Sequence, residues 1–397
     1  MDIYRLRAGI TGIVVLLFSC GIVLAGCKEK SDTGGGGGST QDRIVVGEFA
    51  SLTGSTSTFG IATHEGIQLA IDEANQAGGI DGKQIQLITE DDRSKPEEAT
   101  TVVTKLVTQD KVIAVLGEVS STRSMNGAAV CQPNRTPMIT PSSTNPEVTR
   151  KGDYIFRVCF TDDFQAAVAA KFAIDEGYRR VAIFKDIKND YSVGFAKYFT
   201  EAFTRNGGQV VGEQNYQEGD QDFKAQLNTI KAMKPDAVLI PGYYSEVGTI
   251  ARQAREIGLN VPLIGGDGWD SPQLIPGAGT ALKGCYFTDH NFSVNSKEPE
   301  TVRFVEAYRA RYKKDPDALA ALGYDAARIL VAAMKAARPL TRETLRDAIA
   351  QTRDFPGVTG KITIDGDRNA RKAAVIMRVE ADKFDIYKVY TPEEVGL

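Results

Sequence analysis

The sequence predicts an α/β protein built from two doubly wound lobes. Short apolar runs, many of them β-branched, alternate with amphipathic helical segments, and the second half of the chain repeats this rhythm. Strands that are apolar on both faces and alternate with helices are typical of parallel sheets covered on both sides. The length supports two lobes, because residues 41–397 exceed the roughly 250–300 residues at which a single core stops growing.

The first half of the chain contains five predicted strands. The segments 43–50 (RIVVGEFA) and 112–119 (VIAVLGEV) are almost continuously apolar or β-branched. Apolar residues at helical spacing predict a helix over 61–77, which Gly78 and Gly79 end. The remaining predicted elements are strands at 85–89, 137–140 and 154–160 and a helix at 96–109.

The second half repeats the alternation and ends in a helical region followed by strands. Because ligands of doubly wound sheets bind beyond the carboxyl ends of the strands, two facing lobes predict a pocket in the cleft between them. The predicted strands are 181–185, 210–211, 237–240, 262–264, 360–364, 374–379 and 384–390, the last two forming a pair, and the predicted helices are 164–176, 192–205, 223–233, 246–257 and most of 298–351.

The N-terminus has the layout of a secretion signal. Arg5 and Arg7 precede an uncharged run over 8–26 that combines an apolar core with small residues. The alternative is an uncleaved transmembrane anchor, since about 18 apolar residues can cross a bilayer, although glycine, serine and threonine dilute this run. Either interpretation places most of the chain outside the cytoplasm, attached to a membrane.

The end of that run, Leu24-Ala25-Gly26-Cys27, resembles the lipobox of bacterial lipoproteins. The resemblance implies a signal peptide over 1–26 and a lipid on Cys27, the first residue of the mature chain. A tract with five consecutive glycines follows, and such a tract behaves as a flexible linker. We therefore expect a tether over 27–41 in a membrane-anchored, periplasmic or extracytoplasmic lipoprotein.

Composition narrows the classes of partner. A net charge of −4 provides no electrostatic case for nucleic-acid binding.

The cysteines leave their pairing open. Beyond the signal there are three, Cys131, Cys159 and Cys285, so at least one thiol is unpaired or joins another chain. A Cys131–Cys159 disulfide and three buried free thiols are both open alternatives.

The sequence contains no signature of catalysis. Its two histidines, His64 and His290, are far apart, and no cysteine and histidine spacing suits zinc. A phosphate-binding GxxxxGK[ST] loop and a GxSxG nucleophile elbow are both absent. We therefore expect a binding protein, with no cofactor and no metal, rather than an enzyme.

Two neighbouring strand ends carry small hydroxyl residues. Ser120, Ser121 and Thr122 follow the strand 112–119, and the segment 140–146 (TPSSTNP) ends the next strand. Hydroxyl residues cap helices, and a helix N-terminus with free N–H groups is suited to a carboxylate. Each cluster alone also fits an ordinary cap or turn, but two adjacent clusters together favour an anion site.

Strand ends in the second half carry an acid and aromatic residues. Asp267 follows the strand 262–264 and can accept a charge-assisted hydrogen bond from an ammonium group; the alternative is a loop-capping aspartate. Tyr191 and Tyr243 follow two other predicted strands. Several aromatics around one cleft predict an apolar wall or stacking surfaces for a ligand.

At this level of detail the chain resembles the periplasmic leucine/isoleucine/valine-binding proteins, the hydrophobic amino-acid receptors of ABC transporters. The likeness extends from Arg43 to about Tyr390 and implies a type I periplasmic binding protein-like fold. It rests on the segments GEFASLTGSTSTFG (47–60), NQAGGIDG (75–82), Asp91-Asp92, GEVSS (117–121), TPSSTNP (140–146), YIFRVCF (154–160), GYYSEVGTIARQAR (242–255), GGDGWD (265–270) and AALGYDAA (320–327).

The resemblance implies roles for the polar residues of the cleft. Ser121 would hold the α-carboxylate of an amino acid, with Ser142 and Thr144 adding contacts and Thr122 in the same cluster. Asp267 stands where the family has a glutamate for the α-ammonium, so it keeps the charge with one methylene less.

The resemblance also places the apolar side of the pocket. Phe59 stands where leucine receptors have a tryptophan, and Leu319 where they have a phenylalanine. Tyr191 and Tyr243 match aromatic pocket positions. Ser94 and Ser120 replace a disulfide pair of those receptors, so that cross-link is absent here.

The family's chain crosses between its lobes three times. Here the crossings would fall near Thr161, His290 and Thr363, joining a carboxylate-binding lobe (42–160 with 291–362) to an ammonium-binding lobe (161–290 with 363–397).

The resemblance implies a protein that closes these lobes around a free amino acid, branched-chain or otherwise hydrophobic, and delivers it to the permease subunits of an ABC transporter. We expect this protein to act as a monomer. The alternatives are a sensor for a signalling partner and a receptor for a short amide or aromatic acid.

Overall fold

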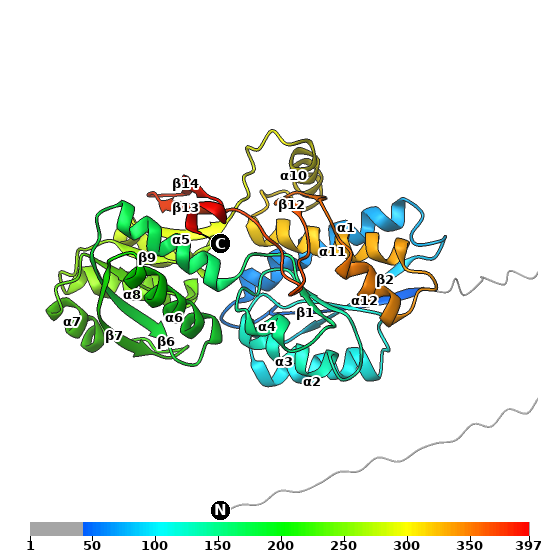
Figure 1. Cartoon of the computed structure of the whole chain (residues 1–397), viewed down its shortest axis with the longest axis horizontal. Helices are drawn as coiled ribbons and strands as arrows, with labels where there is room; N and C mark the ends of the chain where they lie inside the picture. The colour runs from blue at the N-terminus through cyan, green and yellow to red at the C-terminus, as the bar shows by residue number, and fades with distance from the viewer. Residues whose placement is uncertain (1–42, 397) are drawn as a thin grey trace, which may run out of the picture. The chain divides into compact units, whose positions relative to one another are not determined.

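The computed structural model describes residues 43–396, whose two large sheets confirm the predicted α/β class (Figure 1). The predicted signal peptide (1–26), Cys27 and the tether (27–41) lie outside the described residues. The first sheet has the order β2-β1-β3-β4-β5 with every neighbouring pair parallel. Its strands are β1 (Ile44–Ala50), β2 (Ile85–Asp91), β3 (Val115–Leu116), β4 (Met138–Thr140) and β5 (Ile155–Arg157), and the helices between them are α1 (Ser57–Gln76), α2 (Pro96–Thr108), α3 (Ser121–Cys131) and α4 (Glu147–Arg150).

The second sheet has seven strands in the order β14-β13-β10-β9-β8-β6-β7. Strands β6 to β10 are parallel and repeat the strand order of the first sheet, whereas β13 and β14 add an antiparallel edge. The strands are β6 (Arg180–Asp186), β7 (Gln209–Tyr216), β8 (Ala237–Leu239), β9 (Leu263–Gly265), β10 (Tyr286–His290), β13 (Ala374–Val379) and β14 (Phe384–Tyr390).

Helices follow the strands of this sheet as they do in the first. The helices are α5 (Asp162–Asp175), α6 (Asp190–Arg205), α7 (Lys224–Ala232), α8 (Tyr244–Glu256) and α9 (Leu274–Ala278), with 3-10 turns η1 (Asp267–Trp269) and η2 (Gly279–Leu282). The later segments are α10 (Pro299–Tyr312), α11 (Ala318–Ala336), α12 (Arg342–Ala350), the β11 (Phe355–Gly357) and β12 (Gly360–Ile362) hairpin, and η3 (Glu393–Val395).

Local sequence explains where the helices begin. Helix α2 starts with Pro96, which has no N–H to satisfy, followed by Glu97 and Glu98 beside the positive end of the helix. The Asp317 side chain caps α11 by accepting from Ala320 N, and Thr341 caps α12 in a capping box.

Segments far apart in sequence pack together at α1 and α11, which lie side by side (Figure 1). Glycines make this close approach possible. A Cβ on Gly66 would lie 1.9 Å from the Ala320 carbonyl oxygen, and one on Gly323 would lie 2.4 Å from the Thr63 carbonyl oxygen. Because Phe59 and Leu319 lie at the N-terminal ends of these two helices, their packing sets the separation of two predicted pocket residues.

Three connections join the sheets. The first lies between β5 and α5, and the second follows His290 at the end of β10. The third was predicted near Thr363, but residues 364–370 form a turn that stays with the first sheet, since Arg157 N donates to Arg368 O at 3.1 Å. This connection therefore crosses between Ala370 and β13.

Several predicted elements have different bounds. Strand β3 covers only two residues. Hydrogen bonds from Ile113 N to Val45 O and from Gly117 N to Ile139 O nevertheless extend its pairing over most of the predicted strand 112–119. Helix α1 begins four residues earlier than predicted. Strands β10 and β11 were missed, because polar residues interrupt β10 and a proline lies inside β11.

The structure decides between the two alternatives for the cysteines. Cys131, Cys159 and Cys285 are all free and buried, so no disulfide joins Cys131 to Cys159. Those two thiols belong to different apolar clusters and act as small core residues. Within residues 43–396, no helix combines the length and the apolar character needed to cross a bilayer.

Replacing Gly66 with alanine should destabilise the fold, because the new methyl group meets the backbone of α11. We expect the free energy of unfolding in urea to fall by about 1–3 kcal/mol, the usual penalty for overpacking. Gly277→Ala is the matched control, since a Cβ there meets no atom within 4 Å. Equal effects of the two substitutions would contradict the proposed close contact.

Candidate functional site

Eight of the nine predicted ligand residues surround one cavity. The cavity leaves a volume of about 10 Å³ for the centre of a water-sized sphere, and it lies at the carboxyl ends of strands from both sheets. Its lining consists of Phe59, Val119, Ser121, Ser142, Thr144, Tyr191, Tyr243, Asp267, Gly268 and Leu319.

A larger hollow, of about 480 Å³ on the same measure, lies elsewhere, beside the connections between the sheets. It is lined partly by Thr161, Phe164 and the turn 365–372, and it contains none of the predicted ligand residues. The smaller cavity is therefore the candidate site, because the polar groups predicted from the strand ends gather there.

One wall of the cavity offers hydrogen-bond donors. Ser121 is the first residue of α3, where backbone N–H groups have no partner within the helix. Its hydroxyl accepts from Asn145 N at 3.2 Å, which joins this helix to the loop after β4. The Thr144 hydroxyl from that loop is buried and forms no well-aligned hydrogen bond, although Asp162 lies near it. This wall can therefore receive an anionic group.

The opposite wall carries a buried carboxylate. Asp267, at the start of η1, is 7% exposed, and its Oδ1 accepts from Gln165 Nε2 at 3.0 Å. Its Oδ2 lies 3.3 Å from His290 Nε2. An ionised carboxylate has about four lone-pair sites, so capacity remains for a cationic ligand group.

Asp162 lies behind this wall and is fully buried. Burial, reinforced by the negative charge of Asp267, raises the pKa of Asp162 well above its usual value. Asp162 is therefore harder to ionise than a free aspartate, and Asp267 is the acidic side chain that lines the cavity.

His290 is a site residue that sequence reasoning used only to mark a crossing. Its Nε2 lies 3.3 Å from both Asp267 Oδ2 and the Ser142 hydroxyl, so it bridges the two walls. Phe160 stacks on its ring at 4.2 Å between centroids. Recognising β10 as a strand would have revealed His290, which ends that strand as Asp267 follows β9.

Burial keeps the His290 imidazole neutral. Its pKa lies below the ordinary value of 6.5, because burial outweighs the opposing effect of Asp267, and Lys372 adds to the lowering. The Nδ1 atom is buried without a partner, so a proton there would have no acceptor.

Aromatic rings close the apolar side. Tyr191 and Tyr243 stack at 5.4 Å with an interplanar angle of 10°, and Phe59 contacts Tyr243 edge-on at 5.5 Å. The Tyr191 hydroxyl accepts from Gly268 N at 3.3 Å. Burial, followed by the charge of Asp267, raises the pKa of Tyr191 well above its usual value, so its hydroxyl stays a donor.

Thr122 is the one predicted residue that does not line the cavity. Its hydroxyl accepts from Asp190 N at 3.1 Å, and Asn145 Nδ2 donates to Asp190 O at 2.8 Å. Both bonds join loops of the first sheet to α6 of the second. Thr122 therefore contacts the facing loop instead of the cavity.

The described residues contain no cluster of three or more His, Cys, Asp or Glu side chains placed to hold a metal ion. Donors face a carboxylate across a small, partly aromatic cavity, which matches the two opposite charges of a zwitterion.

Comparison with known proteins identifies the family. A family model described as periplasmic binding protein matches residues 43–383. The chain belongs to the periplasmic binding protein family. A member of this kind from Rhizobium johnstonii, a Leu/Ile/Val-binding protein, is 32% identical over 323 residues, which cover 81% of this chain and 87% of the relative.

Solved periplasmic binding proteins share the fold. The leucine binding protein LivK from Thermotoga maritima is 39% identical with a TM-score of 0.85, covering 88% of this chain and 99% of that one. The branched-chain amino acid transporter substrate binding protein LivJ from Streptococcus pneumoniae, solved with isoleucine, is 35% identical with a TM-score of 0.81 and the same coverage. These similarities support the predicted type I periplasmic binding protein fold.

Replacing His290 with glutamine should reduce the loss of stability in acid. Because the folded pKa lies below 6.5, the unfolded chain binds the proton first, and stability falls as pH drops below 6.5 by up to about 1.4 kcal/mol per pH unit. We expect the free energy of unfolding in urea to fall less for the variant than for the wild type between pH 7.5 and pH 5.5.

His64→Gln is the control with the opposite sign. A hydrogen bond to Glu48 raises the pKa of His64, so this histidine adds stability in acid that is lost as pH rises through its folded pKa. If both substitutions change the pH dependence of the unfolding free energy in the same direction, His290 is not neutral and buried.

Proposed function

We propose that the protein is an extracytoplasmic receptor that captures a free amino acid, most often branched-chain, and delivers it to the permease of an ABC transporter. The observation that carries this proposal is the pairing of two opposed walls in one cavity. Ser121 and Thr144 offer donors on one wall, and Asp267 offers a carboxylate on the other. The leucine- and isoleucine-related receptors among the relatives support the same ligand class.

In this proposal the ligand's α-carboxylate lies at the N-terminus of α3, beside Ser121, Ser142 and Thr144. The α-ammonium lies against Asp267, and the side chain faces the apolar group of Phe59, Leu319 and the tyrosine pair. No cationic side chain lines the cavity, so the α-carboxylate is held by hydroxyl and backbone donors.

Closure follows from the division of the site between two lobes, 42–160 with 291–370 and 161–290 with 371–397. The carboxylate is bound by the first lobe and the ammonium by the second, so only the closed state satisfies both. The ligand then shifts the population toward closure by its differential affinity for the two states. Contacts such as Asn145 with Asp190 and Thr58 with Ser271 stabilise that state.

The Asp267→Asn variant tests the ligand class. In the proposal it removes the charge that pairs with the ammonium, and unpairing a buried charge costs about 2–5 kcal/mol of binding. Isothermal titration calorimetry with leucine, isoleucine and valine, on protein unfolded and refolded to remove carried-over ligand, should show a loss of this size.

Asp382→Asn, on the exposed turn between β13 and β14, is the matched control and should bind as the wild type does. Wild-type protein that binds no amino acid but binds benzoate or a short amide would overturn the proposal in favour of the alternative ligands. If the protein binds amino acids, but its gene lies apart from any permease gene and it acts on a signalling partner, the sensor hypothesis is favoured.

We also propose that Cys27 carries a lipid after removal of residues 1–26. In a bacterial host the Cys27→Ser variant should move from the membrane fraction to the soluble fraction, and it should lose labelling by a radioactive fatty acid. Cys20→Ser, inside the same signal but away from the lipobox, should keep both. Retention of Cys27→Ser in membranes would favour an uncleaved anchor.

A further inference from the structure

A buried guanidinium lies behind the donor wall of the cavity. Arg123 is the third residue of α3, two positions after Ser121, and it is 3% exposed. It does not line the cavity. A buried charge is costly unless it is paired and fully hydrogen-bonded, so the partners of Arg123 indicate what it does.

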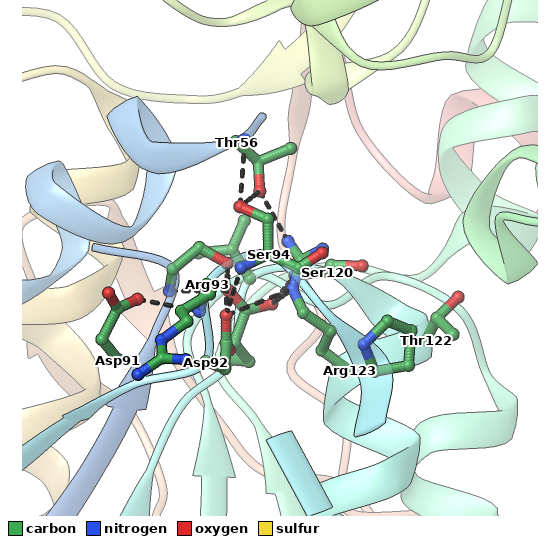
Figure 2. Close-up of polar contacts among 12 residues, drawn as sticks. Thr56, Asp91, Asp92, Arg93, Ser94, Ser120, Thr122 and Arg123 are labelled. Carbon is green, nitrogen blue, oxygen red and sulfur yellow. Dashed lines mark hydrogen bonds and ion pairs between the residues drawn. The ribbon is translucent and has the colours of Figure 1, made fainter. Parts of the chain in front are cut away.

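Those partners come from three different loops (Figure 2). Arg123 Nη2 donates to the Thr56 hydroxyl at 2.8 Å, in the loop after β1. Its Nη1 donates to Ser94 O at 3.4 Å, in the loop after β2, and its Nε lies 3.0 Å from Glu118 Oε2, after β3. One side chain therefore connects the ends of three strands of the first sheet.

Two carboxylates complete the cluster. Ser51 Oγ donates to Asp92 Oδ1 at 2.7 Å and lies 3.0 Å from Glu118 Oε1. Burial and the charge of Glu118 raise the pKa of Asp92 to about 7, and the Asp92 Oδ2 atom has no partner. Without the guanidinium, these two acids would face each other unpaired.

The cluster is connected directly to ligand-facing residues. Thr56 precedes α1, whose third residue Phe59 lines the cavity. Glu118 Oε2 accepts from Ser120 N at 2.5 Å, one residue before Ser121. The position of Arg123 therefore affects both an apolar and a polar wall of the site.

We propose that Arg123 is a positioning residue for the ligand: it holds the loops after β1, β2 and β3 in one arrangement and so fixes Phe59 relative to Ser121. This inference rests on the proposed function for its effect on affinity. Its effect on loop order is independent of any ligand.

The Arg123→Gln variant should bind leucine or isoleucine about 10–100-fold more weakly in calorimetry, a loss of the size found when residues that orient metal ligands are removed. Arg342→Gln is the matched control. Arg342 donates to Val112 O and Val107 O away from the cavity, so it should lose stability without losing affinity.

Rescue separates positioning from a general loss of stability. Ser94 and Ser120 occupy two of the three loops that Arg123 joins. A disulfide from Ser94→Cys with Ser120→Cys should therefore restore affinity in the Arg123→Gln background to within about threefold of the same disulfide variant with Arg123. If Arg123→Gln alone does not fold, this comparison in the cross-linked background is the test. A disulfide that restores the melting temperature but not the affinity would overturn the proposal.

Hydrogen exchange on ligand-free protein distinguishes this inference from the proposed function. Arg123→Gln should speed exchange of amides in 51–60, 92–95 and 118–122, whereas Arg342→Gln should not. Faster exchange with no amino-acid binding by the wild type would retain the positioning role and reject the ligand. Unchanged exchange and unchanged affinity in a folded variant would reject the positioning role.

Discussion

Parallel pairing brings the carboxyl ends of the strands of each sheet to one edge, and the candidate site depends on this constraint. Four residues that line the cavity come shortly after strands: Ser121 after β3, Thr144 after β4, Tyr191 after β6 and Asp267 after β9. Because both sheets share one strand order, their ligand-facing edges are built alike. The packing of α1 against α11 then sets how far apart Phe59 and Leu319 lie.

Two groups of buried polar residues lie near the edges that carry the site. Asp267, His290 and Gln165 form one hydrogen-bonded group, and Arg123 with Glu118 forms another behind the opposite wall. Such groups stabilise little when their desolvation is counted. Their arrangement instead specifies one geometry, since any shift leaves a buried charge without its partner.

The residues that face the cavity differ from the residue that positions them. Ser121 and Phe59 reach the cavity, whereas Arg123 sets the loops from which both extend. The link between the loops that contain Ser94 and Ser120 is ionic and hydrogen-bonded. Such a link depends on charge, whereas a disulfide depends on redox state.

The sequence by itself determined the α/β class, the strand ends that carry polar residues, and eight residues that the structure gathers around one cavity. These follow from local patterns: apolar periodicity defines strands, and residues after a strand lie at its carboxyl end. Tertiary structure alone decided that Thr122 contacts Asp190, that His290 bridges Asp267 and Ser142, and that Arg123 joins Thr56, Ser94 and Glu118. Those contacts join residues distant in sequence, and their distances depend on how sheets and loops pack, which no local pattern encodes.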